Sequence, residues 1–226
     1  MSVGINDSPA PQGVARVFWA SFALASVVFH IGLVFSGLVP NLVSRPVHLI
    51  FVLPWVLIWG RQGLALWSGV ALCAVGVAAA AWVALSHDVL ADQYGFLEGD
   101  LQVWIAAALI CVVLEAARRA IGWPLPLVAL TALLYGLFGQ HIPGRFGHSG
   151  TPVESFLGTL TIAEGGLWGT LTAVSVNVVA IFVIFGAVLN AGEAGQGFMN
   201  VASAAAGRLR GGAAKVSVLS SALFGS

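Results

Sequence analysis

The chain has 226 residues, of which 59% are hydrophobic and only 8% are charged. Soluble domains carry roughly 25% charged residues, so this composition excludes a water-soluble globular protein. Nine Lys and Arg residues balance nine Asp and Glu residues, which excludes the basic surface that nucleic-acid binding requires. Together with a mean hydropathy of +0.97, these values predict an all-α integral membrane protein.

Six apolar runs with few charges are predicted to cross the membrane as helices, because a bilayer core needs about 20 apolar residues in a helix. They are residues 17–39, 46–59, 64–85, 101–117, 120–138 and 167–189. The second run is short, and we expect it to extend back to Leu42 if Arg45 reaches up to the headgroups. A further apolar stretch, 216–224, is too short to cross.

The tryptophans support these boundaries, because amphipathic rings favour the headgroup level. Seven of the eight lie near a predicted boundary, and only Trp55 lies deeper; the seven are Trp19, Trp59, Trp67, Trp82, Trp104, Trp123 and Trp168.

The basic residues predict the orientation, because cytoplasmic loops carry an excess of Lys and Arg. With the N-terminus in the cytoplasm, only Arg45 and Arg145 lie outside, whereas seven bases lie inside: Arg16, Arg61, Arg118, Arg119, Arg208, Arg210 and Lys215. The loop 86–100 has four acidic residues and no Lys or Arg, which suits the outer face. An even number of spans, here six, places both ends of the chain in the cytoplasm.

Two sets of polar residues in the spans are candidates for function. Glu115 precedes Arg118 and Arg119 by three and four residues, so all three share one helical face. This interfacial charge cluster is interpreted as a membrane anchor, with gating or lipid-headgroup binding as the alternative. Asn177 lies in the middle of the last span; helix packing and proximity to a substrate or ion pathway both remain open for it.

Histidines and cysteines offer weaker candidates. A bis-imidazole haem site needs two facing histidines at equal depth, and only His30 and His48 could form one. We expect His48 to lie at the outer boundary and His30 well inside its span, which argues against haem. Cys73 and Cys111 lie in apolar runs and are interpreted as buried small hydrophobic residues.

The C-terminal part of the chain changes character after the last span. Residues 198–210 place apolar and polar side chains on opposite helical faces, which predicts a short amphipathic helix at the membrane surface. The following KVSVLSSALFGS segment mixes apolar residues with Ser and Gly. Such a segment suits either close helix packing or a half-spanning hairpin that holds an ion or a substrate.

Three strings carry a resemblance to a known family: LEAARRAIGWPLPLVALTALLYGLFG at 114–139, EGGLWGTLTAVSVNVVAIFVIFGAVL at 164–189 and GRLRGGAAKVSVLSSALFGS at 207–226. Their order and spacing resemble the fused permease of tripartite ATP-independent periplasmic (TRAP) transporters, of the TAXI subgroup. The last string is the most specific. The first four spans resemble the family only in number, length and topology.

The resemblance implies three segments. Residues 1–15 would be a disordered N-terminus, 16–119 a four-helix domain like the small membrane subunit, and 120–226 the start of a domain like the large subunit. Residues 192–210 would form a surface arm helix, and a re-entrant hairpin would begin at Lys215. Gly225 and Ser226 match the opening of the hairpin tip, where the family has part of a sodium site. Because the family's pattern continues beyond this point, we expect the chain to be the N-terminal portion of a permease, inactive alone.

The function implied by this resemblance is Na⁺-coupled import of small organic acids across the bacterial inner membrane. The implied partners are a periplasmic solute-binding protein, the remainder of the permease and membrane lipids, with no nucleic acid and no covalently bound cofactor. We expect no enzyme activity, since the chain has no HExxH, Walker or GxSxG motif. The alternative is a non-transporting membrane scaffold or assembly subunit.

Overall fold

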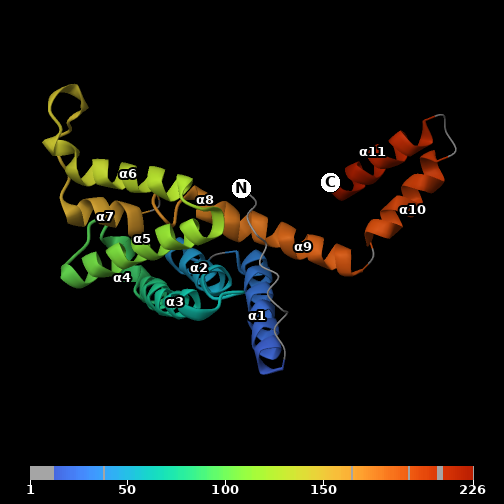
Figure 1. Cartoon of the computed structure of the whole chain (residues 1–226), viewed down its shortest axis with the longest axis horizontal. Coiled ribbons are helices and arrows are strands. Elements are labelled where there is room, and N and C mark those ends of the chain that lie inside the picture. The colour runs from blue at the N-terminus through green and yellow to red at the C-terminus, as the bar shows by residue number, and fades with distance from the viewer. Residues whose placement is uncertain (1–12, 38, 164, 193, 208–210, 226) are drawn as a thin grey trace. The chain divides into compact units, whose positions relative to one another are not determined.

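The computed structural model describes residues 13–37, 39–163, 165–192, 194–207 and 211–225. The chain divides into two compact units, Met1–Asn177 and Val178–Ser226, each of which is described by itself. Every regular element in the described residues is a helix (Figure 1). The prediction of an all-α fold is therefore confirmed.

The first unit holds the longer series of helices. They are α1 (Val14–Ser36), α2 (Asn41–Leu57), α3 (Gly63–Leu85), α4 (His87–Asp92), α5 (Asp100–Ile121), α6 (Pro124–Phe138), α7 (Val153–Thr161) and α8 (Thr170–Val174), with short 3-10 turns at Gly139–His141 and Gly144–Phe146. A π-helical turn, Ser175–Val179, leads on to the second unit, which contains α9 (Ala180–Ala191), α10 (Ala194–Ala206) and α11 (Gly212–Gly225).

Each of the six predicted runs contains a helix, although the helices differ in length. Four helices are long and apolar enough to cross a membrane: Val14–Ser36, Gly63–Leu85, Asp100–Ile121 and Thr170–Ala191. The helix α2 has 17 residues and α6 has 15. At 1.5 Å per residue, both are shorter than the roughly 30 Å of a bilayer core.

The expected backward extension of the second run is confirmed, because α2 begins at Asn41. The side chain of Arg45, however, turns toward the protein. Its guanidinium donates to the backbone carbonyl of Trp168 and, over 2.9 Å, to the side-chain oxygen of Asn41. Arg45 therefore joins the start of α2 to the segment before α8, which the sequence alone did not predict.

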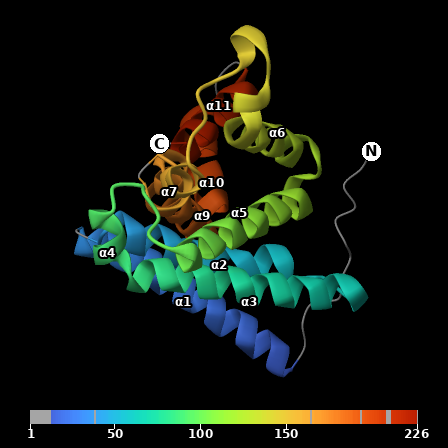
Figure 2. The same ribbon diagram turned by 90° about the vertical axis from the view of Figure 1, so that its left-hand side faces the viewer.

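Helices α2, α3 and α5 pack side by side around small residues of α3 (Figure 2). The α3 residues that are buried recur every three or four positions: Gly69, Cys73, Gly76, Ala79, Ala80 and Val83. A β-carbon added at Gly69 would lie 2.0 Å from the carbonyl oxygen of Leu57, and one at Gly76 would lie 2.8 Å from Val112. Small residues thus let these helices approach closely, which is how membrane helices gain packing energy.

Trp168 and Cys111 depart from the expectations. Trp168 is 1% exposed, because its ring lies in the core of the first unit and its Nε1 donates to the carbonyl of Thr161 over 2.6 Å. Its assignment to the aromatic belt was therefore wrong. Cys73 is buried as expected, whereas Cys111 is exposed on α5.

In the second unit, α10 and α11 pack against each other (Figure 1). The predicted amphipathic helix exists over Ala194–Ala206, and its buried residues include Ala202 and Ala206. A β-carbon added at Gly212 would lie 2.4 Å from the carbonyl oxygen of Gly207, so glycine permits the close return of the chain. Leu209, expected on the apolar face, and Arg210, expected on the polar face, lie outside the described residues.

Candidate functional site

The predicted charge cluster forms at the end of α5. Glu115 accepts hydrogen bonds from Nε and Nη2 of Arg118 over 2.6 and 2.7 Å, and from Nε of Arg119 over 2.7 Å. The guanidinium of Arg118 also lies 5.0 Å from the ring centroid of Trp123, a cation–π contact. The structure therefore brings Glu115, Arg118 and Arg119 together as the helical spacing predicts.

Arg119 does more than neutralise Glu115. Its Nη1 donates to the carbonyls of Leu57 and Ala65 over 3.4 and 3.1 Å, and its Nη2 donates to Oγ of Ser68 over 3.0 Å. The side chain is 9% exposed, against 33% for Arg118. Arg119 thus joins α5 to the end of α2 and the start of α3, a cross-helix role that sequence spacing alone did not reveal.

A second polar constellation links α1, α2 and the π-helical turn. Nε2 of His30 lies 2.8 Å from Nδ1 of His48, and Nε2 of His48 lies 3.1 Å from Oγ of Ser175. Nδ1 of His30 is 2.7 Å from the carbonyl oxygen of Ser26. These four groups form one continuous chain of hydrogen bonds, which we call the histidine chain.

The direction of the hydrogen bonds along the histidine chain follows from the carbonyl oxygen of Ser26. A carbonyl oxygen can only accept, so Nδ1 of His30 carries a hydrogen and, in the neutral ring, Nε2 accepts from Nδ1–H of His48. Nε2 of His48 then accepts from the hydroxyl of Ser175. This assignment follows from the pattern of partners rather than from observed hydrogens.

The expectation that His30 and His48 lie at different depths was wrong. It rested on a second span starting at residue 46, whereas α2 starts at Asn41. His30 is six residues before the end of α1 at Ser36, and His48 is seven residues after the start of α2. Since the two helices run in opposite directions, the rings meet, with centroids 5.0 Å apart and planes at 86°. In the structure they form a direct hydrogen bond.

The histidine chain ends at a partly open pocket. His48 and Ser175 line a space of about 280 Å³ together with Val113, Leu167, Trp168 and Thr172, which we call the inner cavity. Ser175 opens the π-helical turn, and such turns occur often at functional sites. Asn177 lies in the same turn and is exposed.

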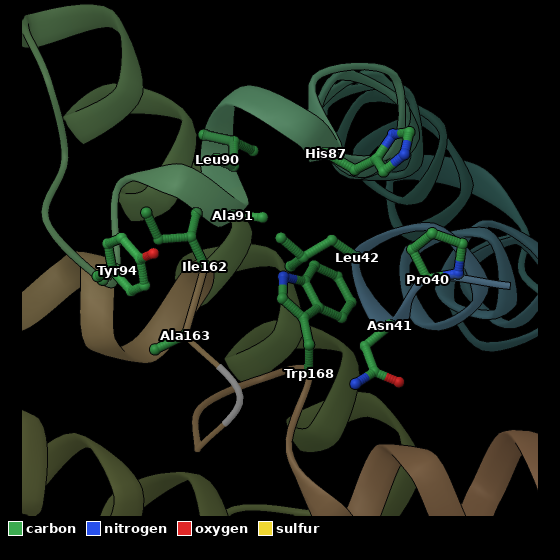
Figure 3. A pocket seen from close by; sticks show the side chains of 11 residues that line it. Pro40, Asn41, Leu42, His87, Leu90, Ala91, Tyr94, Ile162, Ala163 and Trp168 are labelled. Atoms are coloured by element: carbon green, nitrogen blue, oxygen red, sulfur yellow. The ribbon is translucent and has the colours of Figure 1, made fainter. Parts of the chain in front are cut away.

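A larger pocket lies near the start of α2 and the end of α3 (Figure 3). It encloses about 460 Å³ and is lined by residues that include Leu42, His87, Leu90, Tyr94, Ile162 and Trp168. We call it the outer pocket. The sequence singled out no residue of the loop 86–100, and it could not reveal the pocket because the pocket's walls come from segments far apart in the chain.

The remaining candidates lie at the end of the chain. Gly225 is the last residue of α11, and Ser226 lies outside the described residues. The helix α11 has 14 residues, which at 1.5 Å per residue is too short to cross a bilayer. The sodium-site role of Gly225 and Ser226 stays a prediction.

The comparison with protein families gives a match over the second half of the chain. Residues 108–226 match the family described as "Tripartite ATP-independent periplasmic transporter, DctM component". The chain belongs to this family. No curated protein and no solved structure is significantly similar to it.

The DctM match covers the charge cluster, the π-helical turn and the hairpin of α10 and α11. DctM proteins are components of a transporter, not enzymes. Membership supports the TRAP resemblance and a multi-pass membrane permease component, with a periplasmic binding protein and other permease components as partners.

Proposed function

We propose that the chain is the N-terminal portion of a TRAP permease of the TAXI subgroup, which imports small organic acids together with Na⁺ across the bacterial inner membrane. The observation that carries this proposal is the DctM match over 108–226, in a chain with four helices long enough to span a membrane. The substrate class and the coupling ion rest on the resemblance of the strings at 114–139, 164–189 and 207–226.

The charges at the two ends of the first unit support a cytoplasmic N-terminus. Arg61 donates to the carbonyl of Arg119 over 3.3 Å, so the bases that follow α2 and α5 gather at one end. The acidic residues of 86–100 follow α3 and precede α5, at the other end. By the positive-inside rule the end with Arg61 and Arg119 faces the cytoplasm.

Transport is tested in proteoliposomes that contain the full-length permease and its solute-binding protein. Uptake of a labelled organic acid is compared with an inward Na⁺ gradient and with the same gradient of K⁺. We expect uptake only with Na⁺ and only with the binding protein present. Equal uptake in both salts would refute the coupling, and uptake without the binding protein would refute the tripartite mechanism.

A further inference from the structure

We propose that Arg61 and Arg118 bind the headgroup of an anionic phospholipid, such as phosphatidylglycerol, at the end of the first unit where the charge cluster lies. This site requires only that the chain lies in a membrane, and it does not depend on transport. Three features carry it: an excess of guanidinium groups, donors that no protein acceptor uses, and exposed apolar side chains beside them.

Positive charge is in excess at this end of the first unit. Arg61 donates to the backbone carbonyl of Arg119 over 3.3 Å, so its guanidinium joins those of Arg118 and Arg119 around the last turn of α5. In the described part of the chain, Glu115 is the one carboxylate that pairs with them. Two of the three positive charges are therefore left without a counterion among the described residues.

The other described carboxylates lie at the opposite end of α5. Four of them belong to the loop 86–100, which leads into the first turn of that helix. The fifth, Glu154, accepts at its backbone carbonyl from Leu97 of the same loop over 3.3 Å. Since α5 has 22 residues, it separates these groups from Arg118 by roughly 30 Å. They are too distant to neutralise the arginines.

Arg61 and Arg118 keep donors that a ligand can use. Arg118 donates from Nε and Nη2 to Glu115, and its Nη1 has no acceptor within the described chain. Arg61 donates from Nη2 alone, so its Nε and Nη1 are also without an acceptor there. Arg119 differs, because Nε, Nη1 and Nη2 all donate to protein acceptors. Guanidinium groups bind phosphate oxygens through such free donors in charge-assisted pairs.

Exposed apolar side chains adjoin the two arginines. Trp123 is 59% exposed and lies against the guanidinium of Arg118, and Trp67, near the start of α3, is 72% exposed. Tryptophan favours the headgroup level of a bilayer, which places the arginines where lipid phosphates lie. Leu64 and Ile121 are also exposed, and they supply apolar surface for the adjoining acyl chains.

This combination favours a lipid over a free anion. A free phosphate ion would use only the guanidinium donors, whereas a phospholipid also covers the apolar side chains beside them. Net charge then selects among lipids, because phosphatidylcholine carries a cation with its phosphate and phosphatidylglycerol does not. Each basic residue near the membrane surface strengthens the binding of anionic lipid about fivefold.

The test measures the preference of the full chain for phosphatidylglycerol over phosphatidylcholine, as the ratio of their Kd values. Native mass spectrometry of the chain in detergent gives the Kd of each bound lipid. Arg61→Gln/Arg118→Gln removes both charges and keeps polar side chains. Arg145→Gln makes the same kind of change at an exposed arginine beyond the far end of α6, and is the control.

We expect the unchanged chain to prefer phosphatidylglycerol. The Gln double variant should reduce that preference about fivefold for each arginine removed, whereas Arg145→Gln should leave it unchanged. Arg61→Lys/Arg118→Lys keeps both charges and should keep the preference within about twofold. Inorganic phosphate should not displace the lipid. The Tm of the variants in phosphatidylcholine should change little, which separates lost binding from lost folding.

Four results would overturn the site. The first is the absence of a preference in the unchanged chain, and the second is an equal preference in the Gln double variant. The third is displacement of phosphatidylglycerol by inorganic phosphate, which would identify a free anion as the ligand. The fourth is a Lys double variant that loses the preference as fully as the Gln variant. The Lys variant also decides the question if the Gln variant fails to fold.

Discussion

Nδ1–H of His48 donates to Nε2 of His30 over 2.8 Å. The carbonyl oxygen of Ser26 sets that direction, because it requires a hydrogen on Nδ1 of His30. Both neutral rings are therefore expected in the Nδ1–H form. ¹⁵N NMR of the chain in detergent, at a pH where both rings are neutral, reads the two forms directly. An Nε2–H form at His30 would contradict the assignment.

Removing one member of the histidine chain should cost more than removing two. His48→Leu leaves Nε2 of buried His30 and Oγ of Ser175 without their partner, which costs about 1–3 kcal/mol of the free energy of unfolding. The double variant His30→Leu/His48→Leu removes both imidazoles and should regain part of that loss. Unfolding in mixed detergent micelles measures both, and the idea fails if the double variant loses as much stability as His48→Leu alone, or more.

Arg119 should matter more for stability than its neighbour. Arg119→Ala removes the links to Leu57, Ala65 and Ser68 and leaves Glu115 with one partner, for an expected loss of about 3–5 kcal/mol. Arg118 is more exposed, so Arg118→Ala should cost about 1 kcal/mol. Arg119→Lys keeps the positive charge but lacks the planar, multi-donor guanidinium, so it should recover little of the lost free energy of unfolding. Equal losses for the two alanine variants would show that the contacts with α2 and α3 contribute nothing.

The close packing of α2 on α3 predicts contrasting effects of one substitution at two helical glycines. Gly69→Ala places a methyl group 2.0 Å from the carbonyl oxygen of Leu57, so the helices must separate; overpacking costs about 1–3 kcal/mol. Gly32→Ala on α1 meets no atom within 4 Å and should be neutral or stabilising by up to about 1 kcal/mol. Thermal unfolding of both variants compares the two sites.

The orientation is open to a labelling test in cells. In a background with Cys73→Ala and Cys111→Ala, a cysteine in place of Asp92 should react with a maleimide that cannot cross the membrane. A cysteine in place of Gln62, which is exposed before α3, should react only after the membrane is opened. The reverse pattern would place the N-terminus outside and move the outer pocket to the cytoplasm.

Sequence reasoning located the helices and the charge cluster because both depend on neighbours along the chain. Each predicted apolar run contains a helix, four of these helices are long enough to cross a membrane, and the spacing of Glu115, Arg118 and Arg119 predicted their contact. Pro124 begins α6 as its missing N–H allows at a first helical turn. These are local properties, and local rules suffice for them.

The constellations between distant segments were beyond those rules. The charge-free run begins at residue 46 only because Arg45 before it is charged. The helix α2 begins five residues earlier, at Asn41, which places His48 beside His30. The Arg45 side chain donates to acceptors of Trp168 and Asn41 inside the protein, so the helix can begin before it. The outer pocket likewise depends on Trp168, which is 123 residues from Arg45. Sequence analysis expected the Arg45 side chain to reach the headgroups, whereas it links α2 to the segment before α8.

Trp168 lines both the inner cavity and the outer pocket. One indole therefore serves as a shared wall, and any substitution of it alters two compartments at once. To change one pocket alone, a substitution must fall on a residue that lines only that pocket. Leu90 and Ala91 line only the outer pocket, and Val113 and Leu171 line only the inner cavity.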